Sequence, residues 1–188
     1  MSTDTERQVE VDISLTVADL YRFSMRHNYT HASGLLGLLL SLGALVFLFL
    51  NFKDFDSMAV LTLLIIGLSF TVIQPIMLYQ KAHRQIKRTG SFAKPLHYTI
   101  NMEGIRVSQN EQVVIIEWPE VRKLVAAKKA IYIYMSPIRA FIFPVNQCDG
   151  QEKKLKDIVE ECMAKVRSGE IVFTDRYHKE VEKAKNGE

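Results

Sequence analysis

The feature that most restricts how this chain can fold is an uncharged run of 21 residues at positions 32–52, followed by a second uncharged run at positions 57–80. A helix rises about 1.5 Å per residue, so the first run reaches roughly 30 Å, the thickness of the hydrocarbon core of a bilayer, and the second run is long enough to return. A buried helix of this length in a soluble protein would show a polar face, and neither run has one. The sequence therefore predicts a transmembrane hairpin over residues 32–80, with a kink at Pro75 near the end of the second span.

The charges beside the two spans predict their orientation. The short turn between the spans holds one basic residue, Lys53, whereas the segments next to the outer ends of the spans hold six. These six are Arg22, Arg26, Lys81, Arg84, Lys87 and Arg88. Because basic flanks stay on the cytoplasmic side, we expect both termini in the cytoplasm. Cysteines remain reduced there, so Cys162 is interpreted as a small core residue.

Small side chains recur every four residues in the first predicted span, at Ser33, Gly37 and Ser41. This spacing places them on one helix face, where another helix can approach closely. The partner that the sequence favours is the second span, through Gly67 and Thr71, and a homodimer contact is the alternative. Neither span carries Asp, Glu, Lys or Arg, so nothing marks an ion or proton path.

After residue 95 the chain changes to short segments in which apolar and polar residues alternate, separated by turns such as the one at Glu103 and Gly104. This pattern predicts antiparallel strands. The predicted strands are residues 96–100, 105–107, 113–116, 121–125, 131–134 and 140–143. Residues 9–15 alternate in the same way, and Thr16 then caps a helix. An isolated strand is unstable in water, so we expect residues 9–15 to pair with the same sheet.

A helix is predicted to close the series of strands. Apolar residues from Leu155 to Val166 recur at helical spacing, Asp149 and Glu152 have the spacing of a capping box, and Gly169 follows as a stop. We expect the apolar stripe of this helix to cover one open end or edge of the strands.

Three short motifs follow one another in this half of the chain. They are HYTINMEGI at residues 97–105, IEW at residues 116–118 with Val121 three residues later, and AFIFP at residues 140–144. Together with the hairpin, their order and spacing resemble the YcxB-like family, bacterial membrane proteins with two spans and a pleckstrin-homology-like (PH-like) domain. The resemblance implies a strand barrel plugged by a C-terminal helix and a location in the bacterial inner membrane. It implies no catalytic or binding residues.

The predicted fold class is therefore an α+β membrane protein, in which a two-helix transmembrane hairpin is inserted into a small antiparallel PH-like β-barrel or sandwich closed by a C-terminal helix. Its parts are a cytosolic N-terminal strand and helix (1–31), the hairpin (32–80, with spans at about 32–52 and 57–80), a basic juxtamembrane linker (81–93), the PH-like cytosolic domain (94–169) and a charged tail (170–188).

The sequence contains no motif of a known catalytic chemistry: no G-x-S-x-G, no P-loop, no H-E-x-x-H and no cysteine pair at metal-ligand spacing. The net charge of +3 is small and no basic stripe accompanies it, which argues against nucleic-acid binding. His27 and His31 are four residues apart, so a metal pair is conceivable, but a solvated pair at the membrane interface is favoured because no third ligand lies near in sequence. We predict no enzymatic activity, no cofactor and no metal.

The function that the sequence favours is a membrane-tethered interaction or scaffold module facing the cytoplasm, whose sheet edges or open barrel end receive a peptide strand. The predicted partners are membrane lipids and either another protein or a second copy of the chain. Two alternatives are a regulatory subunit that binds a membrane complex through its transmembrane helices, and a lipid-processing enzyme.

Basic residues in the predicted turns are the candidates for contact with lipid headgroups. Each cation near an anionic leaflet contributes about 1 kcal/mol, so several together would hold the domain against a membrane if their turns formed one rim. Ordinary solvated turns are the alternative, because glutamates are interspersed. The candidate residues are Arg122, Lys123, Lys128, Lys129 and Arg139.

Overall fold

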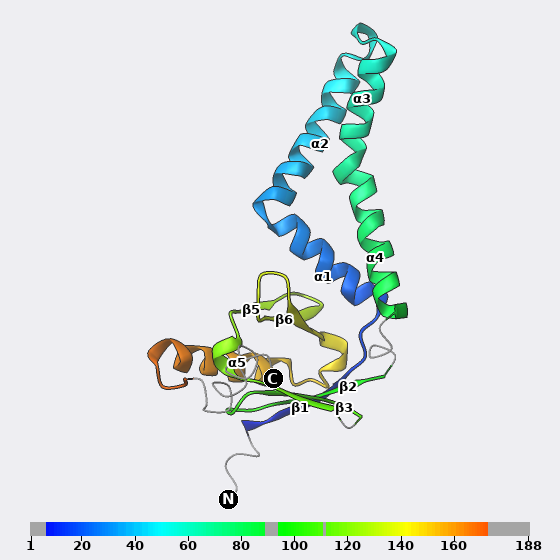
Figure 1. The fold of residues 1–188 in the computed structure, drawn as a ribbon. Coiled ribbons are helices and arrows are strands. Elements are labelled where there is room, and N and C mark those ends of the chain that lie inside the picture. The colour runs from blue at the N-terminus through cyan, green and yellow to red at the C-terminus, as the bar shows by residue number, and fades with distance from the viewer. Residues whose placement is uncertain (1–6, 89–93, 111, 173–188) are drawn as a thin grey trace, which may run out of the picture. The chain divides into compact units, whose positions relative to one another are not determined.

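The structure, a computed structural model of the 188-residue chain, describes residues 7–88, 94–110 and 112–172 (Figure 1). Part of the predicted basic linker, residues 89–93, and most of the predicted charged tail, residues 173–188, lie outside the described residues.

Two compact units divide the chain. The first is formed by residues 1–15 together with residues 91–188, and the second by residues 16–90. The second unit is thus inserted in sequence between the N-terminal arm and the rest of the first unit. The described elements of the first unit are β1 (Val9–Ile13), β2 (Leu96–Ile100), β3 (Ile105–Gln109), β4 (Gln112–Ile116), β5 (Lys123–Ala126), β6 (Ala130–Tyr134), β7 (Ala140–Pro144) and α5 (Glu152–Ser168).

The strands form one four-stranded sheet in the order β1-β2-β3-β4 and one three-stranded sheet in the order β5-β6-β7. Every pair is antiparallel. The predicted pairing of the N-terminal segment is confirmed, because β1 pairs with β2 from Val9↔Ile100 to Ile13↔Leu96. Alternation in β1 buries Val9, Val11 and Ile13 and exposes the residues between them, as expected for a strand with one solvated face.

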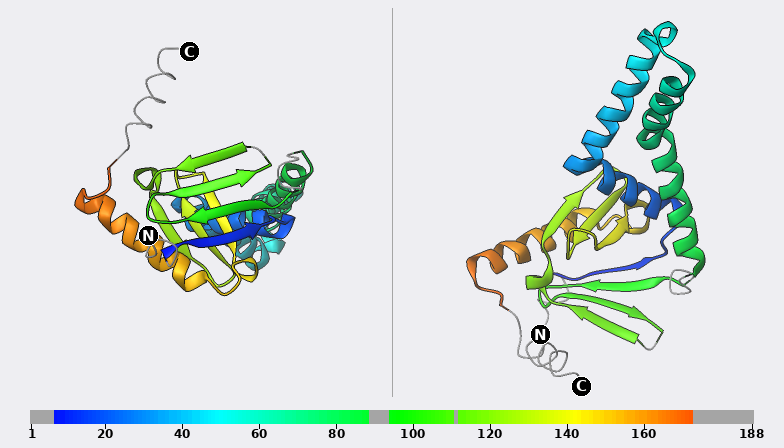
Figure 2. Two further views of the ribbon diagram at one scale, coloured as in Figure 1. Left: turned by 90° about the horizontal axis from the view of Figure 1, so that it is seen from below. Right: turned by 45° about the horizontal axis from the view of Figure 1, so that its top comes forward.

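The strands lie in two separate sheets, so the barrel that the resemblance implies is not observed, and of the two predicted alternatives the sandwich is the one that agrees with the structure. The predicted single meander is interrupted after β4 by a 3₁₀ turn, Trp118–Glu120. Pro119 within this turn has no N–H with which to continue a ladder, so the chain leaves the first sheet here. Figure 2 shows the two sheets stacked on each other, with α5 along their side. The observed architecture is therefore α+β with two antiparallel sheets.

The core between the two sheets is centred on large apolar side chains from both sheets and α5. Trp118 is only 1% exposed, and its Nε1–H donates to the carbonyl oxygen of Asn101 at 3.1 Å, which ties the 3₁₀ turn to the β2–β3 turn. Tyr98 meets Phe143 edge to face, with ring centroids 4.9 Å apart. Cys162 is fully buried, which confirms its interpretation as a core residue.

Helix α5 confirms the predicted helix and its stop but not its predicted start. Gly169 ends the helix in the left-handed conformation at φ 81°, which glycine adopts without the strain of a Cβ. The N-cap is Gln151, which makes no side-chain cap. Asp149 lies in the left-handed region at φ 50°, because the chain reverses direction there. The predicted capping box of Asp149 and Glu152 is therefore wrong.

The second unit is entirely helical over its described residues. Its elements are α1 (Val17–Thr30), α2 (Ala32–Leu50), a short 3₁₀ turn (Phe52–Asp54), α3 (Ser57–Leu68), a π-helical segment (Ser69–Ile73) and α4 (Gln74–Arg88). Helix α2 and the continuous helix from α3 to α4 are long and apolar enough to cross a membrane, with mean hydropathies of 2.4 and 2.1. The prediction of two long apolar helices is confirmed.

Helix α1 is separated from α2 by a bend at His31, which has extended backbone angles. The predicted cap at Thr16 is confirmed: its side chain accepts from the N–H of Asp19, and the Asp19 carboxylate accepts from the N–H of Thr16 in return. Helix α1 packs against α4, where Tyr21 and Tyr79 meet edge to face at a centroid distance of 5.7 Å.

Candidate functional site

The outer face of the four-stranded sheet consists of rows of side chains that the strand register places side by side. Cross-strand neighbours on one face lie about 4.5–5.5 Å apart, so each row forms one continuous strip. In the order β1 to β4, one row is Glu10, Thr99, Arg106 and Ile115. The next row is Asp12, His97, Ser108 and Val113. The face therefore changes from acidic at β1, through polar and basic side chains, to apolar at β4.

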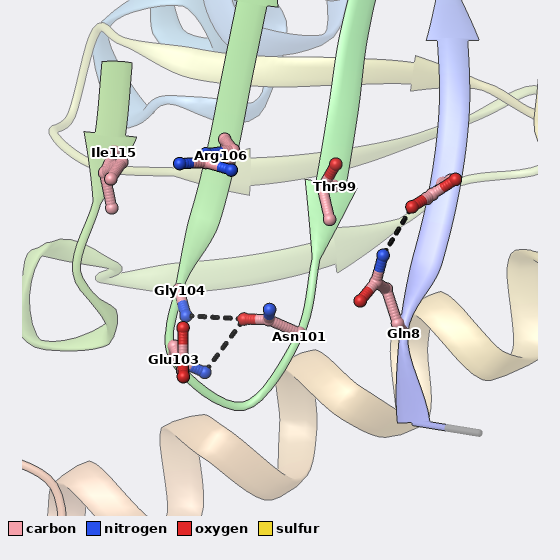
Figure 3. Close-up of a pocket in the computed structure, with 8 residues that line it drawn as sticks. Gln8, Thr99, Asn101, Glu103, Gly104, Arg106 and Ile115 are labelled. Carbon is pink, nitrogen blue, oxygen red and sulfur yellow. Dashed lines mark hydrogen bonds between the residues drawn. The ribbon is translucent and has the colours of Figure 1, made fainter. Parts of the chain in front are cut away.

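An open depression of about 290 Å³ lies on this face, and Figure 3 shows its side chains. The Asn101 side chain accepts from the N–H groups of Glu103 and Gly104 at 2.9 and 3.2 Å, which shapes the β2–β3 turn at one end of the depression. A Cβ at Gly104 would lie 2.5 Å from the carbonyl oxygen of Ile116, so only glycine allows this close approach. The lining residues are Gln8, Glu10, Thr99, Asn101, Glu103, Gly104, Arg106 and Ile115.

The lining of this depression is polar and carries charges of both signs. It combines carboxylates, one guanidinium, amides and the hydroxyl of Thr99. The Gln8 amide donates to the Glu10 carboxylate beside it (Figure 3), so one of the carboxylates already has a partner. The depression therefore offers both hydrogen-bond donors and acceptors to a polar ligand.

Strand β4 is the last strand of the sheet, and its apolar side chains are unusually exposed. Val113, Val114 and Ile115 are 51%, 56% and 40% exposed, although they point alternately to the two faces. One side of β4 pairs with β3, and no strand among the described residues pairs with the other side. In an antiparallel ladder every second residue of such a strand directs its N–H and C=O groups outward, so β4 offers free backbone groups within an apolar strip.

The opposite edge of the same sheet is covered. Gln147 accepts from the N–H of Ser14 at 2.7 Å and donates to the carbonyl oxygen of Ser14 at 3.0 Å, just beyond the end of β1. Gln151 donates to the carbonyl oxygen of Glu10 within β1 at 3.2 Å. These two glutamine side chains occupy outward backbone groups of the β1 edge, so a further strand cannot add there without displacing them. No local sequence pattern predicts this contact, because Gln147 and Gln151 lie more than 130 residues away from β1.

The five basic residues predicted to form a rim do not lie together. Arg122, Lys123 and Arg139 lie at the end of the β5-β6-β7 sheet where β6 turns into β7. Lys128 and Lys129 form the β5–β6 turn at the opposite end. A strand rises about 3.3 Å per residue, so the length of β5 and β6 keeps the two groups apart. The expectation of a single basic rim is corrected to two separate groups.

The β6–β7 turn has an apolar tip that the sequence pattern did not single out. Ile138 is 74% exposed, and the Ser136 hydroxyl accepts from the N–H groups of Ile138 and Arg139 at 3.3 and 3.1 Å, which holds the turn open. The signal that could have found it is an isoleucine directly after Pro137 in a turn, where a polar residue is usual.

Four of the five small residues predicted to form a packing face lie where α2 meets the second long helix. Added Cβ atoms at Gly37 and Gly67 would lie 2.4 Å from the side chains of Phe70 and Leu45, so both glycines allow close helix approach. Ser41 is 1% exposed, and its hydroxyl lies 2.6 Å from the carbonyl oxygen of Gly67. The Thr71 hydroxyl donates to the same carbonyl at 2.6 Å.

Ser33 does not belong to this face, because it is exposed. Its neighbour Gly34 is buried instead, and an added Cβ there would lie 1.8 Å from the carbonyl oxygen of Asn28 in α1. The sharp bend at His31 brings the end of α1 close to the start of α2, and this contact requires glycine at position 34. The spacing of small residues missed this position because the bend is a tertiary feature.

The predicted kink at Pro75 takes the form of the π-helical segment before it. Proline has no N–H and crowds the carbonyl of the residue four positions earlier, so the preceding turn widens. The N–H of Gln74 donates to the carbonyl oxygen of Ser69, five residues back. The carbonyl oxygen of Phe70 accepts instead from the hydroxyl of Tyr29 at 2.5 Å, which fastens α1 to the widened turn.

Elsewhere in the described residues, two sets of titratable side chains stand out: the pair His27 and His31, and the two cysteines. The rings of His27 and His31 lie 4.3 Å apart, and the pKa of His27 is lowered by burial and then by the positive neighbours His31 and Lys81. No cluster of three histidine, cysteine, aspartate or glutamate side chains suited to a metal occurs in the part of the chain that the structure describes. Burial raises the pKa of both Cys148 and Cys162 to about 11, so both thiols stay protonated near neutral pH.

Comparison with known proteins gives one match to a family model and one similar protein. Residues 100–159 match the family model described as YcxB-like protein. A protein of Bacillus subtilis (strain 168), named "Uncharacterized protein YcxB", is 28% identical over 89 residues, which are 47% of this chain and 42% of that protein. The chain thus spans less than half the length of this relative, and no solved structure matches. These matches support the resemblance to the YcxB-like family that the sequence motifs indicated, and residues 100–159 carry the similarity.

Proposed function

We propose that this chain is a membrane-anchored interaction module of the bacterial inner membrane, in which the first unit is a PH-like domain that binds a protein partner by strand addition at β4. The observation that carries the proposal is the contrast between the two edges of one sheet: β1 is covered by Gln147 and Gln151, and β4 presents exposed Val113, Val114 and Ile115. Strand addition gains main-chain hydrogen bonds, and alternate side chains supply the specificity.

The anchor in this proposal is the helical hairpin. It is supported by the apolar surfaces of α2 and the helix from α3 to α4, of which only 22% and 6% of the most apolar windows are buried. A core helix of a soluble protein would bury far more. The basic residues beside the outer ends of the hairpin favour a cytoplasmic location for both termini.

The orientation can be measured with single cysteines in the full-length chain. Asp54→Cys should react in intact cells with a membrane-impermeant maleimide, whereas Lys128→Cys should react only after the membrane is permeabilised. The native Cys148 and Cys162 are buried and give a low background. Labelling of Lys128→Cys in intact cells would overturn the proposed orientation.

We also propose that binding, rather than an enzymatic reaction, is the activity. This is supported by the lining of the depression, which holds no histidine, cysteine or serine, and by the raised pKa of the two thiols. The depression adjoins β4 through Ile115, so it lies beside the proposed binding edge.

Site-specific photo-crosslinking in native membranes tests the proposed interaction surface. A benzoylphenylalanine placed at Val114 should give a crosslinked product of defined mass, and the double change Val113→Lys with Ile115→Lys should abolish it. Lysine on an edge strand disfavours pairing with another strand, and both positions are exposed, so the fold should be retained.

The matched control is the same photo-crosslinker at Ile138, which is also exposed and apolar but lies on the other sheet. Its products should differ from those at position 114 and should be unaffected by the two lysines. Equal products from both positions, or products at position 114 that survive the lysine changes, would count against recognition through β4.

A second candidate function, contact with lipid headgroups, is favoured by one further observation. The exposed tip Ile138 stands beside Arg139, at the same sheet end as Arg122 and Lys123. An apolar tip among cations suits an anionic bilayer surface. An environment-sensitive fluorophore on Ile138→Cys, in nanodiscs with and without anionic lipid, should shift to the blue only with anionic lipid. A fluorophore on Lys128→Cys at the opposite end of the sheet is the control, and equal shifts at both positions would exclude a specific contact.

Binding of a membrane complex through the helices receives less support. Gly37, Ser41 and Gly67 already contact the partner helix of the hairpin, so the close-packing face is occupied within the chain. Gly37→Leu should therefore destabilise the hairpin itself. Loss of a partner from Gly37→Leu with an unchanged hairpin would favour the subunit alternative.

A further inference from the structure

Resting on the proposed strand addition, we infer that the strand which β4 receives is β4 of a second copy of this chain, paired antiparallel about a two-fold axis at Val114. Strand β4 reads Gln112–Ile116, contains no charged residue and exposes apolar side chains on both of its faces. A strand with this pattern is complementary to itself, and a two-fold contact between identical surfaces is the commonest way in which proteins form oligomers.

The apolar pattern specifies the register of this contact. With Val114 opposite Val114 of the second copy, Val113 of each copy lies opposite Ile115 of the other. All of these side chains then meet an apolar neighbour on their own face of the sheet. A shift by two residues keeps the side chains on the same faces but places Val114 opposite Gln112 in one direction and Val113 opposite Glu117 in the other, so the centred register pairs the most apolar surface.

The other sheet edges show the devices that prevent such pairing. The outer face of β1 carries Glu10 and Asp12, and Gln147 and Gln151 occupy its backbone groups. The β5 edge begins with Lys123 and lies against α5. The β7 edge ends at Pro144, which has no N–H. Natural proteins protect edge strands with charges, proline or a covering segment. Among the described edges only β4 lacks all three, as expected of an edge that is used.

The charges around the seam are compatible with a second copy. The register places Arg106 beside Ile115 and Ser108 beside Val113, so across the two-fold axis each arginine row continues into the serine row of the other copy. Three strand spacings of about 4.8 Å across the sheet and two residues along the strands separate the two Arg106 side chains, which is roughly 16 Å. This exceeds the Debye length of about 8 Å at physiological salt, so the arginines do not repel each other appreciably.

The size of the contact explains why it would need the membrane. Two five-residue strands bury less than the area of about 1,200 Å² that is typical of stable complexes, so the contact is weak between freely diffusing copies. Anchoring both copies in one bilayer raises their effective concentration, which converts a weak contact into a populated dimer. The test therefore uses the full-length chain in its own membrane.

Disulfide crosslinking of the full-length chain in native membranes tests the inference. The side chains at position 114 of the two copies would lie about 4.5–5.5 Å apart between Cβ atoms, near the range that a disulfide spans. Val114→Cys should give a covalent dimer under mild oxidation, at least tenfold more than Ile138→Cys, a control on the other sheet that is even more exposed. Comparable yields at the two positions, or no dimer at position 114, would overturn the inference.

A mixing experiment tests the register. Coexpressed Val113→Cys and Ile115→Cys chains, carrying tags of different mass, should form mixed dimers in preference to dimers of either chain with itself, because position 113 faces position 115 of the other copy. Predominant self-crosslinking of both chains would overturn the centred pairing.

The crosslinking results also separate this inference from the proposed function. If Val114→Cys forms no dimer and the photo-crosslinker at position 114 still captures another protein that the lysine changes release, the second copy is wrong and strand addition stands. If the photo-crosslinker at position 114 gives no product sensitive to those lysines, both proposals fall.

Discussion

Strands β1 and β4 are the two edges of one sheet, yet the fold treats them in opposite ways. In the inner-face row Val11, Tyr98, Val107 and Val114, the first valine is 2% exposed and the last is 56% exposed. The β1 edge lies over the core and is capped by Gln147 and Gln151, whereas β4 extends beyond the core. The comparison teaches that the exposure of an edge strand depends on which segments pack over it and not on its position in the sheet.

The largest effect is expected from the loss of Trp118, a side chain of the core on which the sheet packs. Trp118→Ala should lower the free energy of unfolding by about 3–5 kcal/mol, because a fully buried aromatic side chain is lost and a cavity remains. Trp118→Phe should cost less, since it keeps an aromatic ring and leaves a smaller cavity, although it also loses the hydrogen bond to Asn101. Denaturation followed by far-ultraviolet circular dichroism measures both, because Trp118 is the only tryptophan and its fluorescence is lost in both variants. Equal losses in the two variants would show that the hydrogen bond, and not packing, dominates.

The second prediction compares the two valines of the inner-face row directly. Val11→Ala should cost about 1–3 kcal/mol, because it removes buried methyl groups from the core. Val114→Ala should change the stability of the dilute, detergent-solubilised chain by less than about 0.5 kcal/mol, because the side chain is exposed. Thermal unfolding of both variants under the same conditions provides the comparison. A similar cost for the two substitutions would mean that β4 is covered by something in the folded chain.

The third prediction concerns the removal of a side chain that covers the β1 edge. Gln147→Ala should destabilise the chain by about 1 kcal/mol, because both hydrogen bonds to the backbone of Ser14 are lost. Hydrogen exchange of the Ser14 amide should become faster, while the amides of β3 keep their protection. Gln151→Ala, which removes one bond to Glu10, is the matched weaker change. Unchanged exchange at Ser14 would contradict the capping role of Gln147.

The smallest expected effect concerns the thiols beneath the sheets. Burial raises the pKa of Cys162 from its usual value of 9.0 to about 11. The folded state therefore favours the neutral thiol, so this contribution is fully present below pH 9 and is lost as the pH rises from 9 to 11. The melting temperature of the parent chain should fall more steeply over this interval than that of Cys162→Ala. Identical slopes would show that Cys162 does not titrate with the fold, with Cys148→Ala as the parallel test.

Much of the secondary structure was predictable because it depends on local patterns. The alternation in β1 and β2, the turn at Gly104, the cap at Thr16 and the stop at Gly169 each follow from residues next to one another in sequence. The cap of α5 was not predictable in this way. Asp149 has the right spacing from Glu152, but the tight turn before α5 places it in a left-handed conformation that cannot cap a helix.

The candidate surface was only partly predictable. The uncharged, apolar composition of β4 is visible in the sequence, but the same residues would also be typical of a buried central strand. The basic residues looked like one rim because Arg122, Lys123, Lys128 and Lys129 are close in sequence, and the hairpin of β5 and β6 then carries them to opposite ends.

The sequence by itself determined the two long apolar helices, the antiparallel strands and the amphipathic closing helix, because hydrophobic periodicity is a local property of the chain. Only the tertiary structure decided that the strands form two sheets rather than a barrel, that Gly34 rather than Ser33 is packed at the bend, and that β1 is covered while β4 is open. These outcomes depend on contacts between residues far apart in sequence, such as Ser14 with Gln147, and no local pattern encodes which distant segment will arrive at an edge.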